Sequence, residues 1–187
     1  LEAIASKHGL ALIFDAAHAF GVRYKGKSIL EYGDASMVSL HATKLLHAVE
    51  GGFVVARDPA VAEKVEWMRR FGHTNHDGFH GVGINAKMSE LHAAMGLCNL
   101  KHTEEILNNR KDVCRAYDEA LSSLEYIFKF PIREMTDWNY SYYPVIFDTE
   151  ISLLSAIERL NAADIFPRRY FYPNLSSCFC DDPEFCP

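Results

Sequence analysis

Ser39-Leu40-His41-Ala42-Thr43-Lys44 is followed shortly afterwards by Glu50-Gly51-Gly52 and the apolar run Phe53-Val54-Val55-Ala56. Residues 37–40 and 53–56 are typical of β-strands, so Lys44 lies in a polar turn between two strands of a rigid scaffold. Most loop lysines are solvated surface charges. A lysine that is partly desolvated can instead lose its proton and attack a carbonyl group, which makes Lys44 the candidate nucleophile.

A second motif, Asp15-Ala16-Ala17-His18, follows the apolar run of residues 10–14. This run predicts a buried strand of a parallel sheet, and ligands of such sheets bind just beyond the carboxyl ends of the strands. Asp15 could hold a protonated pyridine nitrogen there, and His18 could reach a phenolic oxygen of the same ring. The alternative is that Asp15 caps a helix or turn and that His18 is an ordinary polar neighbour.

Four motifs in this order resemble the DegT/DnrJ/EryC1/StrS sugar aminotransferases, which are fold-type I enzymes dependent on pyridoxal 5'-phosphate (PLP). The resemblance covers residues 2–173, and its motifs are Asp15-Ala16-Ala17-His18-Ala19-Phe20-Gly21, Ser39-x-His41-Ala42-Thr43-Lys44, Glu50-Gly51-Gly52 and Gly83-Ile84-Asn85-Ala86-Lys87-Met88-Ser89-Glu90-Leu91-His92-Ala93-Ala94-Met95-Gly96.

The resemblance implies a role for each matching residue in PLP binding. Lys44 would carry the internal aldimine, Asp15 would pair with the pyridine nitrogen and His18 would lie near the ring hydroxyl. Ser39 would bind the cofactor phosphate, and Asn85 would reach the phosphate in the neighbouring subunit, so a homodimer with shared sites is expected. Lys87 stands where many members have Arg, and an ammonium cannot reproduce a bidentate guanidinium contact.

The segment Phe166-Pro167-Arg168-Arg169-Tyr170-Phe171-Tyr172-Pro173 is a candidate substrate site. Arg168 and Arg169 could bind phosphates while Tyr170 stacks on a base or sugar, and the alternative is a strand edge with solvated charges. The family carries a similar segment. The resemblance therefore implies a nucleotide-sugar substrate, most similar to a dTDP-4-keto-6-deoxyhexose, with glutamate as the usual amino donor.

Two further sets of residues are open to a metal-binding interpretation. The first is a loop with His73, His76, Asp77 and His80. Its imidazole and carboxylate groups could converge on zinc. Alternatively, the segment could be a polar mobile loop, or a loop that leans over a partner subunit's site. The second set is Cys178, Cys180 and Cys186, whose spacing is no standard zinc knuckle. With Cys98 and Cys114 these are most simply reduced thiols, and we predict no metal.

Composition and charge narrow the function classes. The 187 residues are 49% hydrophobic, with a net charge of -6, which argues against nucleic acid or an anionic membrane as the main partner. No apolar run has transmembrane length and no signal peptide precedes the first helix, so a cytoplasmic location is expected.

The predicted architecture is α/β, with helices expected over residues 59–70, 87–100 and 103–122 and strands over residues 126–130 and 140–147. Residues 1–122 would form the second half of a fold-type I large domain, a mainly parallel sheet with flanking helices, and residues 123–187 part of a small α+β domain. The resemblance implies that the family's N-terminal part and C-terminal end are absent from this chain. Two rival functions are a non-catalytic binding or regulatory protein on the PLP scaffold, and a PLP- or PMP-dependent sugar dehydratase. Dehydratases replace the lysine with His, so Lys44 argues against the second.

Overall fold

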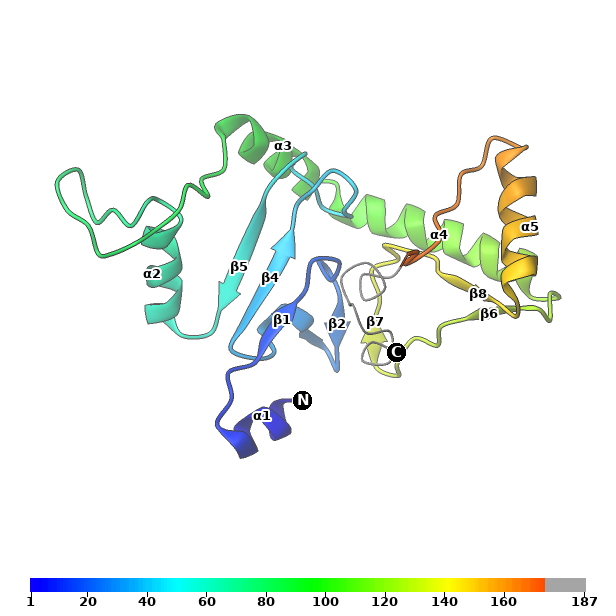
Figure 1. The fold of residues 1–187 in the computed structure, drawn as a ribbon, viewed down its shortest axis with the longest axis horizontal. Coiled ribbons are helices and arrows are strands. Elements are labelled where there is room, and N and C mark those ends of the chain that lie inside the picture. The colour runs from blue at the N-terminus through cyan, green and yellow to red at the C-terminus, as the bar shows by residue number, and fades with distance from the viewer. Residues whose placement is uncertain (174–187) are drawn as a thin grey trace. The chain divides into compact units, whose positions relative to one another are not determined.

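The computed structural model describes residues 1–173, which form a mixed α/β arrangement of short strands and flanking helices (Figure 1). The helices are α1 Glu2–His8, a 3-10 helix Ile29–Glu31, α2 Pro59–Met68, α3 Glu90–Leu100, α4 Thr103–Leu121 and α5 Glu150–Asn161. The strands are β1 Ile13–Asp15, β2 Arg23–Tyr24, β3 Lys27–Ser28, β4 Ala35–Ser39, β5 Gly52–Ala56, β6 Ile127–Lys129, β7 Thr136–Asp137 and β8 Val145–Phe147.

The sheet that carries the two site motifs has the order β1-β4-β5 (Figure 1). β1 and β4 are parallel, with Asp15 opposite Met37, so their carboxyl ends meet at one edge. β5 runs antiparallel to β4, because the loop between them folds straight back and no crossover helix intervenes. The strands predicted at 10–14, 37–40 and 53–56 are therefore confirmed, with shifts of up to three residues at their ends. The prediction that the first strand is buried is wrong for the described chain, because Ile13 is 67% exposed.

A second sheet of order β3-β2-β7 brings a distant segment to the first. β7 pairs antiparallel with β2 through Arg23↔Asp137 and Tyr24↔Thr136. This pairing delivers the residues after β7 to the turn that follows β1. The prediction of a strand over 140–147 is wrong for its first half, since only Val145–Phe147 is a strand and residues 140–144 are irregular.

The helices begin at the predicted residues or within three residues of them. Asp58 caps α2, its Oδ1 accepting the backbone N–H of Ala60 at 2.9 Å, and Pro59 occupies the first turn. α3 begins at Glu90 after the N-cap Ser89, three residues later than predicted from residue 87. α4 spans the predicted range 103–122 to within one residue. None of the helices in residues 1–173 is long and apolar enough to span a membrane.

A small apolar core lies beneath the loop that joins β4 to β5. Its buried members are Leu40, Leu46 and Ala48, with Phe20, Phe53 and Met88 packed against them. The loop is therefore held from inside by its own leucines, which makes it a firm support for Lys44.

The chain divides into two compact units. The first comprises residues 1–123 and 130–144, and the second has residues 124–129 and the part of the chain from 145 onward. In the second unit β6 pairs antiparallel with β8, and the N-cap Thr149 begins α5. Residues 130–144 thus group with the first unit, although the sequence assigns them to the second. The domain boundary at 122/123 stays a prediction for the complete protein.

Candidate functional site

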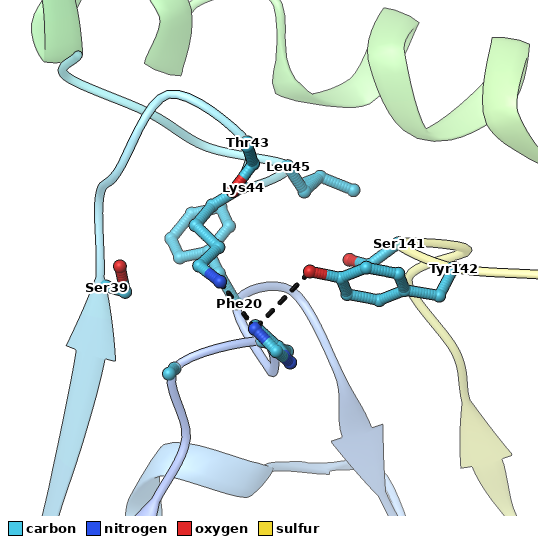
Figure 2. A pocket seen from close by; sticks show the side chains of 9 residues that line it. Phe20, Ser39, Thr43, Lys44, Leu45, Ser141 and Tyr142 are labelled. Atoms are coloured by element: carbon cyan, nitrogen blue, oxygen red, sulfur yellow. Dashed lines mark hydrogen bonds between the residues drawn. The ribbon is translucent and has the colours of Figure 1, made fainter. Parts of the chain in front are cut away.

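The loop between β4 and β5 presents Lys44 to a pocket. Its ends are tied by Leu40 N–H donating to the Gly51 carbonyl at 2.9 Å and Ala48 N–H donating to the Leu40 carbonyl at 2.8 Å. Leu45 and Leu46, which follow the lysine, are 5% and 7% exposed. Because the neighbouring side chains are anchored inside, the Lys44 side chain is directed into the pocket, as Figure 2 shows.

Lys44 and the motif at the end of β1 meet, as the parallel pairing of β1 with β4 requires. Asp15 Oδ1 accepts the backbone N–H of Ala17 at 3.0 Å, and Ala19 N–H donates to the Ala16 carbonyl at 2.9 Å, so the chain turns at once after the strand. This turn places His18 Nε2 2.5 Å from Lys44 Nζ. The alternative in which Asp15 caps a turn is thus also realised in the structure.

Burial in the pocket lowers the pKa of His18 below its ordinary 6.5, and the positive charge of Lys44 lowers it further, while Asp15 opposes the shift. The imidazole is therefore neutral near pH 7. Its Nε2 can then accept from the Lys44 ammonium, which requires the ring proton to sit on Nδ1. The pair is a cation beside a neutral acceptor, an arrangement through which a proton can pass.

The sequence did not point to a third group at the pocket, which comes from the segment of residues 139–142, with Ser141 and Tyr142 lining the pocket itself. The Tyr142 hydroxyl lies 3.3 Å from His18 Nε2, and the two rings are 4.9 Å apart. The Ser141 hydroxyl is buried at the pocket with no hydrogen-bond partner among the described atoms. Asn139, which is 1% exposed, donates to the His18 carbonyl. The aromatic composition of this segment favours a strand, and that prediction gave its polar residues no role in the site.

The pocket combines an amine, an imidazole and several hydroxyls with an apolar wall (Figure 2). A second, more open cavity of about 320 Å³ shares Ala17 and His18 with this pocket and is also lined by Asp15. The residues that line the first pocket are Ala17, His18, Phe20, Ser39, Thr43, Lys44, Leu45, Ser141 and Tyr142. Such a set can bind a carbonyl compound at the amine and orient a polar ring beside it.

Ser39 reaches the same pocket from the end of β4. Its Oγ accepts the backbone N–H of His41 at 3.3 Å, and His41 Nδ1 lies 2.9 Å from the Thr43 hydroxyl. His41 also lies 3.6 Å from the Glu50 carboxylate. The hydroxyls of Ser39 and Thr43 therefore line one side of the pocket as potential hydrogen-bond donors.

Asn85 is not among the residues that line this pocket. Its side chain is exposed, and its Oδ1 accepts from Lys87 Nζ at 2.6 Å. The Lys87 ammonium also lies 4.0 Å from the centre of the Phe71 ring. Within one chain Asn85 thus lies outside the pocket of Lys44, and its role toward a neighbouring subunit stays a prediction.

The predicted substrate segment belongs to the second unit. The Arg169 guanidinium donates to Glu150 Oε1 at 2.7 Å and covers the Tyr172 ring at 3.6 Å. Arg168 lies over the Tyr170 ring at 5.1 Å. Both arginines are therefore held against aromatic faces, which orients their planar groups without saturating their donors.

The histidine loop is organised by ring stacking. The rings of His73 and Phe79 lie 4.5 Å apart at a tilt of 31°, and the two residues form an isolated β-bridge, while the His80 ring lies 5.4 Å from that of Trp67. Within residues 1–173 no three His, Cys, Asp or Glu side chains converge to hold a metal ion. Cys178, Cys180 and Cys186 lie outside the described residues, and Cys98 and Cys114 are free thiols.

The chain is similar to known sugar transaminases. Over 172 residues it is 36% identical to the dTDP-4-amino-4,6-dideoxy-D-glucose transaminase of Shigella dysenteriae, covering 91% of this chain and 47% of that protein. The Escherichia coli enzyme of the same name is 35% identical over 183 residues, covering 95% and 48%. The chain thus spans about half the length of the curated relatives it matches.

A solved structure, DesI in the presence of its TDP-sugar product, is 34% identical with a TM-score of 0.87, covering 96% of this chain and 47% of that one. This likeness confirms the predicted α/β class of a partial fold-type I large domain. The profile of the DegT/DnrJ/EryC1/StrS aminotransferase family matches residues 1–182. The order and spacing of the motifs around Lys44, their meeting in one pocket and this match together show that the chain belongs to the DegT/DnrJ/EryC1/StrS aminotransferase family.

Proposed function

We propose that the complete protein is a PLP-dependent aminotransferase that moves an amino group from glutamate to a nucleotide-linked keto sugar, most simply a dTDP-4-keto-6-deoxyhexose. The observation that carries this proposal is the meeting of Lys44 Nζ with His18 Nε2 at the carboxyl ends of β1 and β4. The names of the two transaminase relatives support the sugar class.

The donor set fits PLP. Lys44 supplies a primary amine for its aldehyde, Asp15 a carboxylate for its pyridine nitrogen, and His18 a neutral imidazole for its ring hydroxyl. The buried Ser141 hydroxyl, without a partner in the structure, shows that the pocket holds polar capacity still to be satisfied. When bound, PLP supplies an electron sink for the carbon atom that loses and regains a proton.

The chain's own residues would bind the group and move the proton. Ser39 at one side of the pocket, and Asn85 of a second copy of the chain, would bind the cofactor phosphate. Phe20 and Leu45 contribute apolar side chains to the lining of the pocket. Lys44 Nζ would carry the proton, and His18 Nε2 would hold that proton in a hydrogen bond between transfers.

The substrate diphosphate would bind to the arginine segment. Arg168 and Arg169 offer planar donor groups that are already oriented by Tyr170 and Tyr172. An anionic diphosphate would compete with Glu150 for the Arg169 guanidinium, since both are oxygen acceptors. Tyr170, exposed in the described chain, would provide a face for a base or sugar ring.

The test is incubation of the complete protein with PLP, reduction with sodium borohydride and mapping of the modified peptide by mass spectrometry. Reduction fixes any PLP carbonyl that has condensed with a lysine amine. We expect the mass increase at Lys44. Lys44→Ala should lose this label, and its rate of amine transfer should fall by about 10²–10⁴-fold, the range for removing a proton-transferring group.

The matched control is Lys25→Ala, which removes a lysine outside the pocket and should leave both labelling and transfer unchanged. A folded Lys44→Ala protein that still transfers the amine at a substantial rate would contradict the proposal. Labelling elsewhere with none at Lys44 would instead support a binding protein on the same scaffold.

A further inference from the structure

Asn139 joins the two halves of the pocket through one buried side chain. Its Nδ2 donates to the His18 carbonyl at 2.9 Å and to the Phe20 carbonyl at 2.8 Å. Its Oδ1 accepts the backbone N–H of Ser141 at 3.2 Å. A primary amide has two donor hydrogens, so both are used, and the acceptor is used as well.

These bonds connect the two segments beyond the point where their backbone pairing ends. The bond between Asn139 and His18 spans 121 positions of the sequence. The pairing of β2 with β7 ends at Asp137, before this point. Burying an amide costs free energy unless every group is bonded, so a full set of bonds at 1% exposure indicates a specific clamp rather than packing alone.

The residues beside the clamp are those that face the amine. His18 itself carries the bonded carbonyl, and Tyr142 follows directly after the bonded Ser141. Their side chains meet at 3.3 Å between the phenol oxygen and Nε2, on the same Nε2 that lies next to Lys44 Nζ. A shift of either segment would separate imidazole, phenol and amine.

We propose that Asn139 is a positioning residue of the Lys44 site, which fixes the His18 imidazole between the Lys44 amine and the Tyr142 hydroxyl. The proposal rests on the proposed function, because it assigns Asn139 a role in the same site. A merely structural residue would contribute stability, and its loss would leave the imidazole where it is in the molecules that still fold.

The experiment is an NMR titration of the His18 imidazole in the complete protein without added cofactor. In wild type, Lys44, Asp15 and Tyr142 face the ring. We expect the pKa of His18 to rise toward 6.5 in Asn139→Ala, since the ring leaves its partly desolvated place beside Lys44, and to rise less in Asn139→Ser, which keeps one donor. A folded Asn139→Ala variant with the wild-type titration would overturn the proposal.

The matched control is Asn99→Ala. The half-buried Asn99 also donates its amide to a backbone carbonyl, that of His47 at 2.9 Å, but it touches neither His18 nor Tyr142. We expect its titration of His18 to follow wild type. An equal pKa rise in this control would show general loosening and would also overturn the proposal.

A wild-type measurement keeps the test decisive if the Asn139 variants do not fold. Both side-chain amide protons of Asn139 should exchange with solvent slowly, because both are bonded and buried, and rapid exchange would refute the clamp. The outcomes separate the two proposals. Absence of PLP labelling at Lys44 in wild type removes the proposed function, whereas an unchanged His18 titration removes only the role of Asn139.

Discussion

Replacing Leu46 by alanine should destabilise the protein and loosen the support of Lys44. Leu46 is 7% exposed and packs in the cluster with Leu40 and Ala48 beneath the loop between β4 and β5. The change removes three buried carbon atoms. Nothing in the described cluster can replace them without moving the loop, so the cost includes a cavity as well as lost burial.

The magnitude follows from the area lost and from the cavity. About 0.8 kcal/mol per buried carbon gives a transfer loss of about 2.4 kcal/mol. Adding part of the cavity cost brings the expected loss to about 3 kcal/mol, within the range for buried leucines. In a protein of this size that corresponds to a fall in Tm of roughly 6–12 °C.

Urea denaturation followed by circular dichroism measures the loss, with Leu91→Ala as the matched control. Leu91 is 84% exposed, so the same chemical change should cost less than about 0.5 kcal/mol there. Borohydride labelling at Lys44 should also become slower in Leu46→Ala. A loss below about 1 kcal/mol, or equal losses in the two variants, would refute the reasoning that the buried leucine anchors the loop.

Two further predictions concern charge and backbone. Because the pKa of His18 is lowered in the folded state, the unfolded chain binds the proton more readily, so this group's contribution to stability is present above pH 6.5 and declines as pH falls below it. Lys44→Met should raise the pKa of His18 in an NMR titration, because it removes the neighbouring positive charge, and the control Lys25→Met should not. Gly33→Ala should cost more than Gly26→Ala in urea denaturation. Both glycines have positive φ, which should cost an alanine about 1–2 kcal/mol of folding stability at either position. Only at Gly33 would the new Cβ also meet the Leu12 carbonyl oxygen, at 2.7 Å. Equal losses in the two variants would contradict the steric argument.

Much of the fold could be predicted because its signals are local. The Asp58-Pro59 cap, the Ser89 cap and the stripe of α4 each act within a few residues, and the helices begin and end within three residues of the expected positions. The irregular course of residues 140–144 could not be predicted. Their aromatic side chains favour a strand, but the bond between the Tyr143 hydroxyl and Asp118 and the Asn139 clamp override that preference.

The candidate site was predictable in part for the same reason. Asp15 and Ser39 end the parallel neighbours β1 and β4, and His18 and Lys44 lie in the turns after them. The carboxyl ends of parallel neighbours share one edge, so the meeting of these residues follows from the strand pattern. The roles of these residues remain predictions, and the labelling experiment tests the role of Lys44. Asn85, Arg168 and Arg169 lie elsewhere in the chain, and their part in the site depends on partners and substrate.

The sequence alone therefore predicts the capped helices, the strands beside Lys44 and Asp15, and the family to which the motifs belong. Only the tertiary structure places Asn139 and Tyr142 on His18. Helix caps and strand ends leave a pattern because they involve neighbouring residues, whereas a hydrogen bond across 121 positions leaves none. It forms because the pairing of β7 with β2 brings a buried amide to two carbonyl groups that need donors.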